Sequence, residues 1–166
     1  MQRIEINKYK KKIKVYQENI DTFTVVGPLG KISFKHQNVS FFSQNNTFFV
    51  TEESTALFHA KVKKSFKSVS FGWYKELNLN GIGYKSFKIN DLLALDVGYS
   101  SLITYKPPKD VKIKIFKNKI VLFSIYQDLL NNVTLLLKDY ATPDPYKAKG
   151  ILLKNEKIKL KKKSKS

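Results

Sequence analysis

The order of the periodic segments constrains the fold most strongly, because strands followed by a helix occur twice along the chain. The strands predicted in the first half span 12–16, 22–26, 31–34, 39–42 and 47–50. A helix is expected to begin near Glu52 or Glu53, since apolar residues then recur on one helical face. These apolar positions are Phe58, Val62, Phe66 and Val69.

The second half repeats this order of elements. Strands are predicted at 77–79, around Phe87, and at 92–97, 111–115 and 119–123. The segment Ser124-Ile125-Tyr126-Gln127 has the form of a capping box, which predicts the start of a helix. The apolar stripe of this helix consists of Leu129, Leu130, Val133, Leu136, Leu137 and Tyr140. A last strand is expected over 151–160.

A short internal similarity supports a tandem duplication. Gly30-Lys31-Ile32-Ser33-Phe34-Lys35 matches Gly83-Tyr84-Lys85-Ser86-Phe87-Lys88 at four of six positions. Together with the repeated order of elements, it predicts an α+β fold of two tandem similar domains. Each domain would be a small, mainly antiparallel sheet packed with one helix. The expected domains span 1–74 and 75–160, and a lysine-rich tail follows at 161–166.

Positive charge is concentrated at the two ends of the chain. The formal net charge is +18, and residues 141–166 carry nine lysines against Asp144 and Glu156. This balance points to a polyanionic partner, either nucleic acid or an anionic membrane surface. Arg3 is the only arginine, so phosphate contact is favoured over the bidentate reading of bases. The lysines between 61 and 67 form either a solvated helix face or an RNA contact.

The segment Pro143-Asp144-Pro145-Tyr146-Lys147-Ala148-Lys149-Gly150-Ile151 is the strongest candidate for binding. Two prolines stiffen the backbone, and an extended chain would place Lys147 and Lys149 on the same side. Tyr146 offers an aromatic platform, and Gly150 allows the backbone to approach another surface closely. These features suit an irregular phosphate surface. The alternative interpretation is a proline-bounded connector with solvated lysines.

The residues that usually carry catalysis or hold metals do not form a recognisable pattern. The chain has no cysteine, and His36 and His59 lie apart from any carboxylate cluster. Gly81-Ile82-Gly83 lacks the form and the helical context of a nucleotide-binding loop. An enzymatic activity, a cofactor, a metal site and a small-molecule substrate are therefore not expected. No apolar run approaches the ~20 residues that span a bilayer, so membrane insertion is not expected either.

The segment 143–151 resembles the signature of the bacterial-type large-subunit ribosomal protein L-six family. That signature reads Pro-Glu/Asp-Pro-Tyr-Lys-Gly/Ala-Lys-Gly followed by an aliphatic residue, and every position is met here. Further segments resemble the family in the same order along the chain. They are Val26-Gly27-Pro28-Leu29-Gly30-Lys31-Ile32, Leu79-Asn80-Gly81-Ile82-Gly83-Tyr84-Lys85 and Gly98-Tyr99-Ser100.

The resemblance implies a structural protein of the large ribosomal subunit, built from two tandem α+β domains. Members of this family bind large-subunit rRNA chiefly through the second domain. They lie near the stalk base and the factor-binding region, beside neighbouring large-subunit proteins. Lys85 and Lys138 stand where the family usually has arginine, and Ser101 replaces a common histidine. The first domain is shortened.

The resemblance and the charge pattern together assign a set of rRNA-binding residues. Lysines would neutralise phosphates, while Tyr146, Tyr84 and Tyr99 would stack on bases or riboses. The full set is Tyr84, Lys85, Tyr99, Lys138, Tyr146, Lys147, Lys149, Gly150, Lys154, Lys157, Lys159, Lys161, Lys162 and Lys163. The tail from Lys154 is expected to become ordered only against RNA. Its alternative interpretation is a solubilising or localisation-type lysine run.

The composition also favours one cellular location. Abundant lysine, asparagine, isoleucine and phenylalanine with a single arginine is typical of an AT-biased coding sequence. Residues 1–14 resemble neither a secretory signal nor a transit peptide. These features predict an organelle-encoded protein of the mitochondrial ribosome, with a plastid or bacterial ribosome as alternatives. The competing functional class is a free-standing basic module that binds nucleic acid or an anionic membrane.

Overall fold

The computed structural model of the chain describes residues 2–5, 13–19, 21–35, 41–44, 47–50 and 56–161. The expected start of the first helix lies outside these residues, as do His36, Lys162 and Lys163. The chain forms two compact units, residues 1–72 (unit 1) and 73–166 (unit 2). This division falls two residues before the expected boundary between 74 and 75, because a strand of unit 2 already begins at Trp73.

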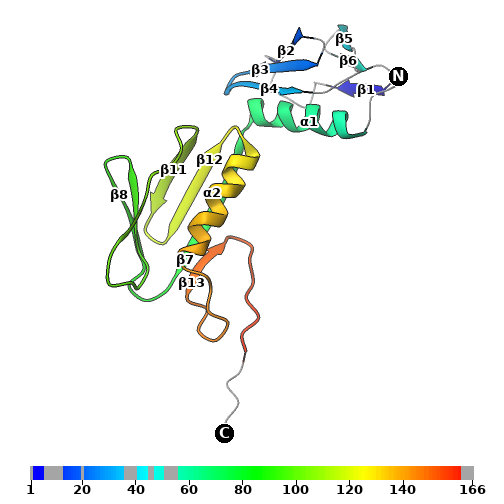
Figure 1. Cartoon of the computed structure of the whole chain (residues 1–166). Helices are drawn as coiled ribbons and strands as arrows, with labels where there is room; N and C mark the ends of the chain where they lie inside the picture. The colour runs from blue at the N-terminus through cyan, green and yellow to red at the C-terminus, as the bar shows by residue number, and fades with distance from the viewer. Residues whose placement is uncertain are drawn as a thin grey trace. The chain divides into compact units, whose positions relative to one another are not determined.

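Within its described residues, unit 1 contains two small antiparallel sheets and one helix (Figure 1). The first sheet has the order β1-β6-β5, formed by Gln2–Glu5, Thr47–Val50 and Phe41–Gln44. The second has the order β2-β3-β4, formed by Lys14–Asn19, Thr22–Gly27 and Gly30–Lys35. Helix α1, Ala56–Ser70, packs against the second sheet.

The core of unit 1 forms where alternate residues of β3 meet the apolar face of α1. The buried side chains are Phe23, Val25, Phe58, Val62, Phe66 and Val69, so the predicted helical face is confirmed. The turn between β3 and β4 is tied to the end of α1. The Leu29 N–H donates to the Val69 C=O at 3.1 Å, and a Cβ on Gly27 would lie 2.6 Å from Val69 Cγ2.

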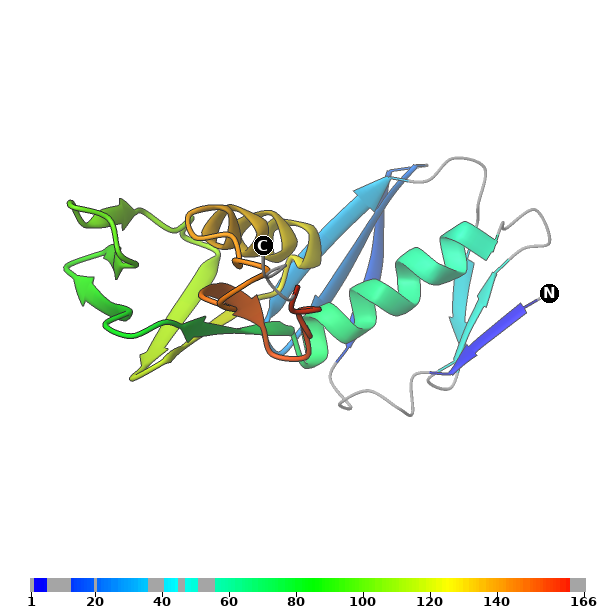
Figure 2. The same ribbon diagram turned by 90° about the horizontal axis from the view of Figure 1, so that it is seen from below.

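Unit 2 is a four-stranded antiparallel sheet covered on one face by a helix, with a smaller sheet beside it (Figures 1 and 2). The larger sheet has the order β11-β12-β7-β13, formed by Val111–Phe116, Lys119–Ser124, Trp73–Asn80 and Gly150–Leu153. The smaller has the order β10-β9-β8, formed by Ile103–Tyr105, Leu92–Asp96 and Lys85–Ile89. Helix α2 is Gln127–Asp139. The predicted tandem α+β architecture is confirmed.

The main core of unit 2 lies between α2 and the larger sheet. Leu130, Val133 and Leu137 of α2 join one buried cluster with alternate residues of the strands. The strand residues of this cluster include Leu77, Leu79, Val111, Ile120, Leu122 and Ile151. Leu136 of the predicted apolar stripe is 49% exposed, because the buried side of α2 is formed by Leu130, Val133, Thr134 and Leu137.

Two predictions about the ends of elements in unit 2 are wrong. Ser124 does not cap α2, because its backbone still pairs in β12, and the N-cap is Tyr126 without a side-chain cap. The Ser124 Oγ instead accepts a hydrogen bond from the Tyr126 N–H at 3.1 Å. The last strand ends at Leu153 rather than near 160, because the chain turns at 154–155.

Candidate nucleic-acid interface

The loop between α2 and β13, residues 143–150 (the signature loop), is closed by its own hydrogen bonds. The Ala148 N–H donates to the Asp144 C=O at 2.9 Å, and the Asp144 N–H donates to the Lys149 C=O at 2.8 Å. The Asp144 carboxylate accepts the Tyr146 N–H at 2.8 Å, which is the bond of an Asx turn. The signature loop is therefore a compact turn, and the prediction of an extended segment is wrong.

Gly150 makes this compact turn possible. It has φ +149°, and a Cβ at this position would lie 2.5 Å from the Cα of Pro143 and 2.9 Å from the Ala141 oxygen. The close backbone approach predicted for Gly150 is thus made to its own chain, and Gly150 is buried. Ala148 has φ +53°, a left-handed conformation that glycine adopts without strain.

The segment after β13, residues 154–161, folds back onto unit 2. The Lys154 N–H donates to the Glu76 C=O at 3.0 Å, and the Lys161 N–H donates to the Pro145 C=O at 3.0 Å. The second bond ties the tail to the signature loop. The prediction that the tail is ordered only against RNA is therefore wrong for this segment, because backbone hydrogen bonds already hold it.

Glu156 holds the middle of the tail against the end of α2. Its Oε1 lies 2.5 Å from the Lys138 Nζ, and its Oε2 accepts the Leu153 N–H at 3.1 Å. The hydrogen bond from Lys138 is the main reason that the pKa of the Glu156 carboxyl lies below its ordinary value. Lys138 is thus paired within the protein, and its charge is less available to a phosphate than the sequence suggested.

Glu76 of β7 pairs in the same way with two lysines. It accepts a hydrogen bond from Lys154 at 2.8 Å and contacts Lys119 at 3.0 Å. The hydrogen bond from Lys154, and after it the one from Lys119, lowers the pKa of the Glu76 carboxyl. The hydrogen bond to Glu76 in turn raises the pKa of Lys154. Lys154 therefore fixes the start of the tail as well as carrying charge.

Five predicted lysines are exposed around the signature loop and have no ion-pair partner among the described residues. Tyr146, 50% exposed, lies in the same loop. Backbone hydrogen bonds at Lys154 and Lys161 hold the two ends of the tail segment that carries the tail lysines. We call Tyr146 and these lysines the loop–tail surface; the lysines are Lys147, Lys149, Lys157, Lys159 and Lys161.

Tyr84 and Tyr99 lie in the turns that flank β8 and β9. The ring of Tyr84 is wedged between two glycines: a Cβ on Gly81 would lie 2.7 Å from it, and one on Gly98 would lie 3.5 Å from it. Tyr84 is half-buried against the core, so its ring has a limited free face. Tyr99 is 59% exposed. The Lys85 side chain is exposed at the start of β8.

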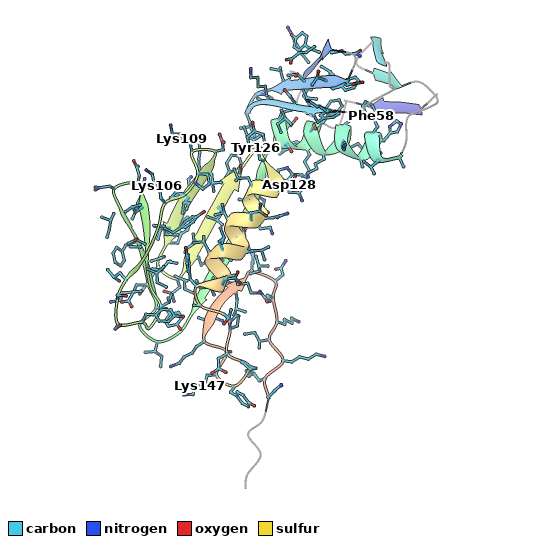
Figure 3. The ribbon with its side chains drawn as sticks, in the orientation of Figure 1. Phe58, Lys106, Lys109, Tyr126, Asp128 and Lys147 are labelled. Atoms are coloured by element: carbon cyan, nitrogen blue, oxygen red, sulfur yellow. The ribbon has the colours of Figure 1, made fainter. Side chains whose placement is uncertain are left out.

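The topology brings these turns and the signature loop to the same end of unit 2. Asn80, the last residue of β7, pairs with Gly150, and the turn carrying Tyr84 follows at once. Figure 3 shows Lys147 at this end and Lys106 and Lys109 at the opposite end of unit 2. The predicted residues that the structure describes therefore gather at this end of unit 2. Two of them, Lys138 and Lys154, are paired there with glutamates.

Within the described residues, other kinds of site find no support. No group of three or more His, Asp or Glu side chains lies close enough to hold a metal ion. Burial is the main cause that lowers the pKa of His59, followed by the charge of Lys63. In the described part of the chain, no helix combines the length and the apolar character needed to cross a membrane.

Sequence comparison identifies the family. Over 150 residues, the chain is 33% identical to the large ribosomal subunit protein uL6 of Hydrogenobaculum sp., covering 85% of this chain and 83% of that protein. The chain belongs to the uL6 family. It is also 31% identical over 166 residues to uL6c of Guillardia theta, covering 93% and 91% of the two chains. The uL6m protein of Dictyostelium discoideum is 35% identical over 119 residues, covering 71% and 70%.

Membership of the uL6 family confirms the resemblance found in the sequence. The family consists of structural proteins of the large ribosomal subunit and not of enzymes, as expected. Bacterial, plastid and mitochondrial forms of uL6 all match the chain. No protein-family model matches it.

Proposed function

We propose that this uL6 protein binds large-subunit rRNA through the loop–tail surface, near the stalk base and the factor-binding region, and so supports translation. The observation that carries the proposal is the hydrogen bond from the Lys161 N–H to the Pro145 C=O. It joins the tail to the signature loop, so that the exposed lysines of the two segments are carried on adjoining, hydrogen-bonded backbone. A fixed array loses less conformational entropy on binding than a mobile lysine tail does.

The expected mode of binding is phosphate contact. Lys147, Lys149 and the exposed tail lysines would neutralise phosphates and release counterions, so affinity would fall steeply with salt concentration. Tyr146 would stack on an unpaired base or ribose. Neighbouring large-subunit proteins at the stalk base are the expected protein partners. No cofactor is needed for this role.

The mitochondrial ribosome is the proposed particle. A single arginine among thirty-one basic residues supports an AT-biased genome, which favours an organelle. The match to uL6m of Dictyostelium discoideum is compatible with that origin. Sequencing the rRNA that co-purifies with the tagged protein tests this assignment, because plastid or bacterial rRNA alone would contradict it.

Sucrose-gradient sedimentation of a lysate at moderate and at high salt tests the role in the ribosome. The protein is expected in the large-subunit fraction at moderate salt, and high salt should release a part of it. The competing function, a free-standing basic module, predicts light fractions at every salt concentration. Recovery only in light fractions, even at low salt, would overturn the proposed function.

A further inference from the structure

The face of the larger sheet of unit 2 that α2 does not cover carries aromatic and lysine side chains. The register aligns Tyr74 of β7 with Phe123 of β12, and Phe123 with Lys112 of β11. Lysines and a second exposed aromatic lie in the neighbouring rows. We call this set the open sheet face; its residues are Tyr74, Lys112, Lys114, Phe116, Lys119 and Phe123.

The alternation of the strands shows that these side chains point away from α2. Leu77 and Leu79 of β7, and Ile120 and Leu122 of β12, are buried in the cluster that contains α2 residues. Successive side chains in a strand point to opposite faces, so the residues between them belong to the other face. Tyr74 agrees with this placement, because it is 74% exposed.

Two of the aromatic side chains on this face, Tyr74 and Phe116, are exposed. Phe116 is 55% exposed, and Phe123 is half-buried between Tyr74 and Lys112 in the cross-strand row. Neighbouring strands lie about 4.8 Å apart. Tyr74 and Phe123 thus stand on neighbouring strands, and aromatic side chains placed in this way can receive neighbouring bases of one RNA strand, since each base presents a π-face.

The charge of the open sheet face is positive. Lys112 and Lys114 are exposed on β11. The carboxylate on the same face, Glu76, is held by Lys119 at 3.0 Å and by Lys154 at 2.8 Å. Its charge is thus compensated within the protein, and it presents little repulsion to a polyanion.

We propose that the open sheet face binds a single-stranded or looped-out stretch of RNA, with bases stacked on Tyr74 and Phe123 and phosphates beside Lys112 and Lys114. Aromatic platforms on a four-stranded sheet are a general way to bind unpaired bases. A protein partner fits less well, because lysine is depleted in the cores of protein interfaces. The inference rests on the proposed function for the identity of the RNA, but it concerns a surface distinct from the loop–tail surface.

Titration of the full chain with a ten-nucleotide single-stranded RNA containing 2-aminopurine tests the inference. Stacking quenches 2-aminopurine fluorescence, and anisotropy of a labelled copy reports affinity. Tyr74→Ala should weaken binding about fivefold or more and reduce the quenching, whereas Tyr74→Phe should retain both. Tyr16→Ala, at a 50% exposed tyrosine of unit 1, is the matched control and should bind as the wild type does.

The outcomes separate this inference from the proposed function. Unchanged binding and quenching for Tyr74→Ala, with weaker binding for Lys147→Glu combined with Lys149→Glu, would overturn the inference and leave the proposed function. Unchanged RNA binding by Tyr74→Ala with poorer retention in the large subunit would assign the face to a neighbouring protein and also overturn it. If all of these variants bind RNA as the wild type does, the result would contradict both the inference and the proposed function.

Discussion

Unit 1 and unit 2 each pack one helix on an antiparallel sheet, and they differ in what surrounds that arrangement. On the face of β3 away from α1, Thr24 is buried, donates a hydrogen bond to Glu18 at 2.9 Å and shares one with Ser33 at 2.8 Å. The corresponding face of unit 2 exposes Tyr74 and Phe116. The face of unit 1 thus has a buried polar contact at its centre and one exposed aromatic, Tyr16, which pairs with Thr24, whereas the face of unit 2 has two exposed aromatics.

The segments that follow the two helices differ as well. α1 ends in a short turn at Phe71 and Gly72, which leads directly into β7. α2 is followed by the signature loop, by the edge strand β13 and by the tail segment 154–161, which backbone hydrogen bonds hold at Lys154 and Lys161. The comparison teaches that both units share a helix-on-sheet core, while the proposed loop–tail surface belongs to segments that only unit 2 has after its helix.

The largest expected effect is the loss of stability when a closely packed glycine is replaced, and it can be compared between the two units. Gly150→Ala should destabilise unit 2 by about 2–3 kcal/mol, because a Cβ would meet the backbone of Pro143 at 2.5 Å in a conformation strained for alanine. Gly27→Ala should destabilise unit 1 through Val69. Thermal unfolding measures the stability of each variant, and hydrogen exchange shows which unit is destabilised. Only Gly150→Ala should also weaken RNA binding, and equal loss of binding in both variants would break the comparison.

Charge reversal compares the two units directly. Lys147→Glu combined with Lys149→Glu should weaken RNA binding at least about tenfold and lower the salt slope by about 2, since two phosphate contacts are lost. The matched control is Lys31→Glu combined with Lys35→Glu, which changes two exposed lysines of β4 in unit 1 by the same charge. Filter binding over a range of salt concentrations is the measurement. Comparable losses in the two variants would show that net charge alone drives binding.

A smaller effect is expected from relieving strain in the signature loop. Ala148→Gly should stabilise unit 2 by up to about 1 kcal/mol, because glycine adopts the φ of +53° without the cost that a Cβ brings. Denaturant unfolding of the full chain measures the change. A lower stability of Ala148→Gly would contradict this expectation. It would show that the smaller conformational entropy of the unfolded chain with alanine outweighs the backbone strain in the folded state.

The smallest expected effect is the response to acid, which should differ between the units. The pKa of Glu76 and of Glu156 is lowered by folding, so their stabilisation of unit 2 exists above about pH 4.5 and is lost as the pH falls through their folded values. The pKa of His59 is also lowered, so unit 1 loses stability already as the pH falls below about 6.5. Hydrogen exchange of each unit between pH 7 and 3 measures the two windows. Glu156→Gln should flatten only the response of unit 2, and the same window for both units would contradict these assignments.

Much of the fold follows from local patterns. The spacing of Phe58, Val62 and Phe66 predicts the buried face of α1, because a helix repeats every 3.6 residues and these side chains meet one sheet. The alternation of Val111, Ile113 and Ile115 with lysines predicts β11 in the same way. The resemblance in the signature loop predicted the family, because its backbone geometry needs particular residues at several neighbouring positions.

The geometry of the candidate site was less accessible from sequence. Lys138 pairs with Glu156 across 18 positions, and Lys154 pairs with Glu76 across 78, distances in sequence at which charge patterns carry no local signal. The compact signature loop depends on the Asp144 side chain, although an Asp between prolines is a known turn signal that would have argued against an extended segment. The open sheet face needed the strand order and register before its aromatic residues could be placed together.

Ultraviolet crosslinking of intact large subunits, followed by mass spectrometry of nucleotide-bearing peptides, tests the central claim most directly. Binding through unit 2 predicts nucleotide adducts on peptides that contain Tyr146 and on peptides from the pinned tail, residues 154–161. The matched peptides of unit 1 from β2 to β4 should carry few adducts. Adducts confined to unit 1, with none between residues 143 and 161, would contradict the account.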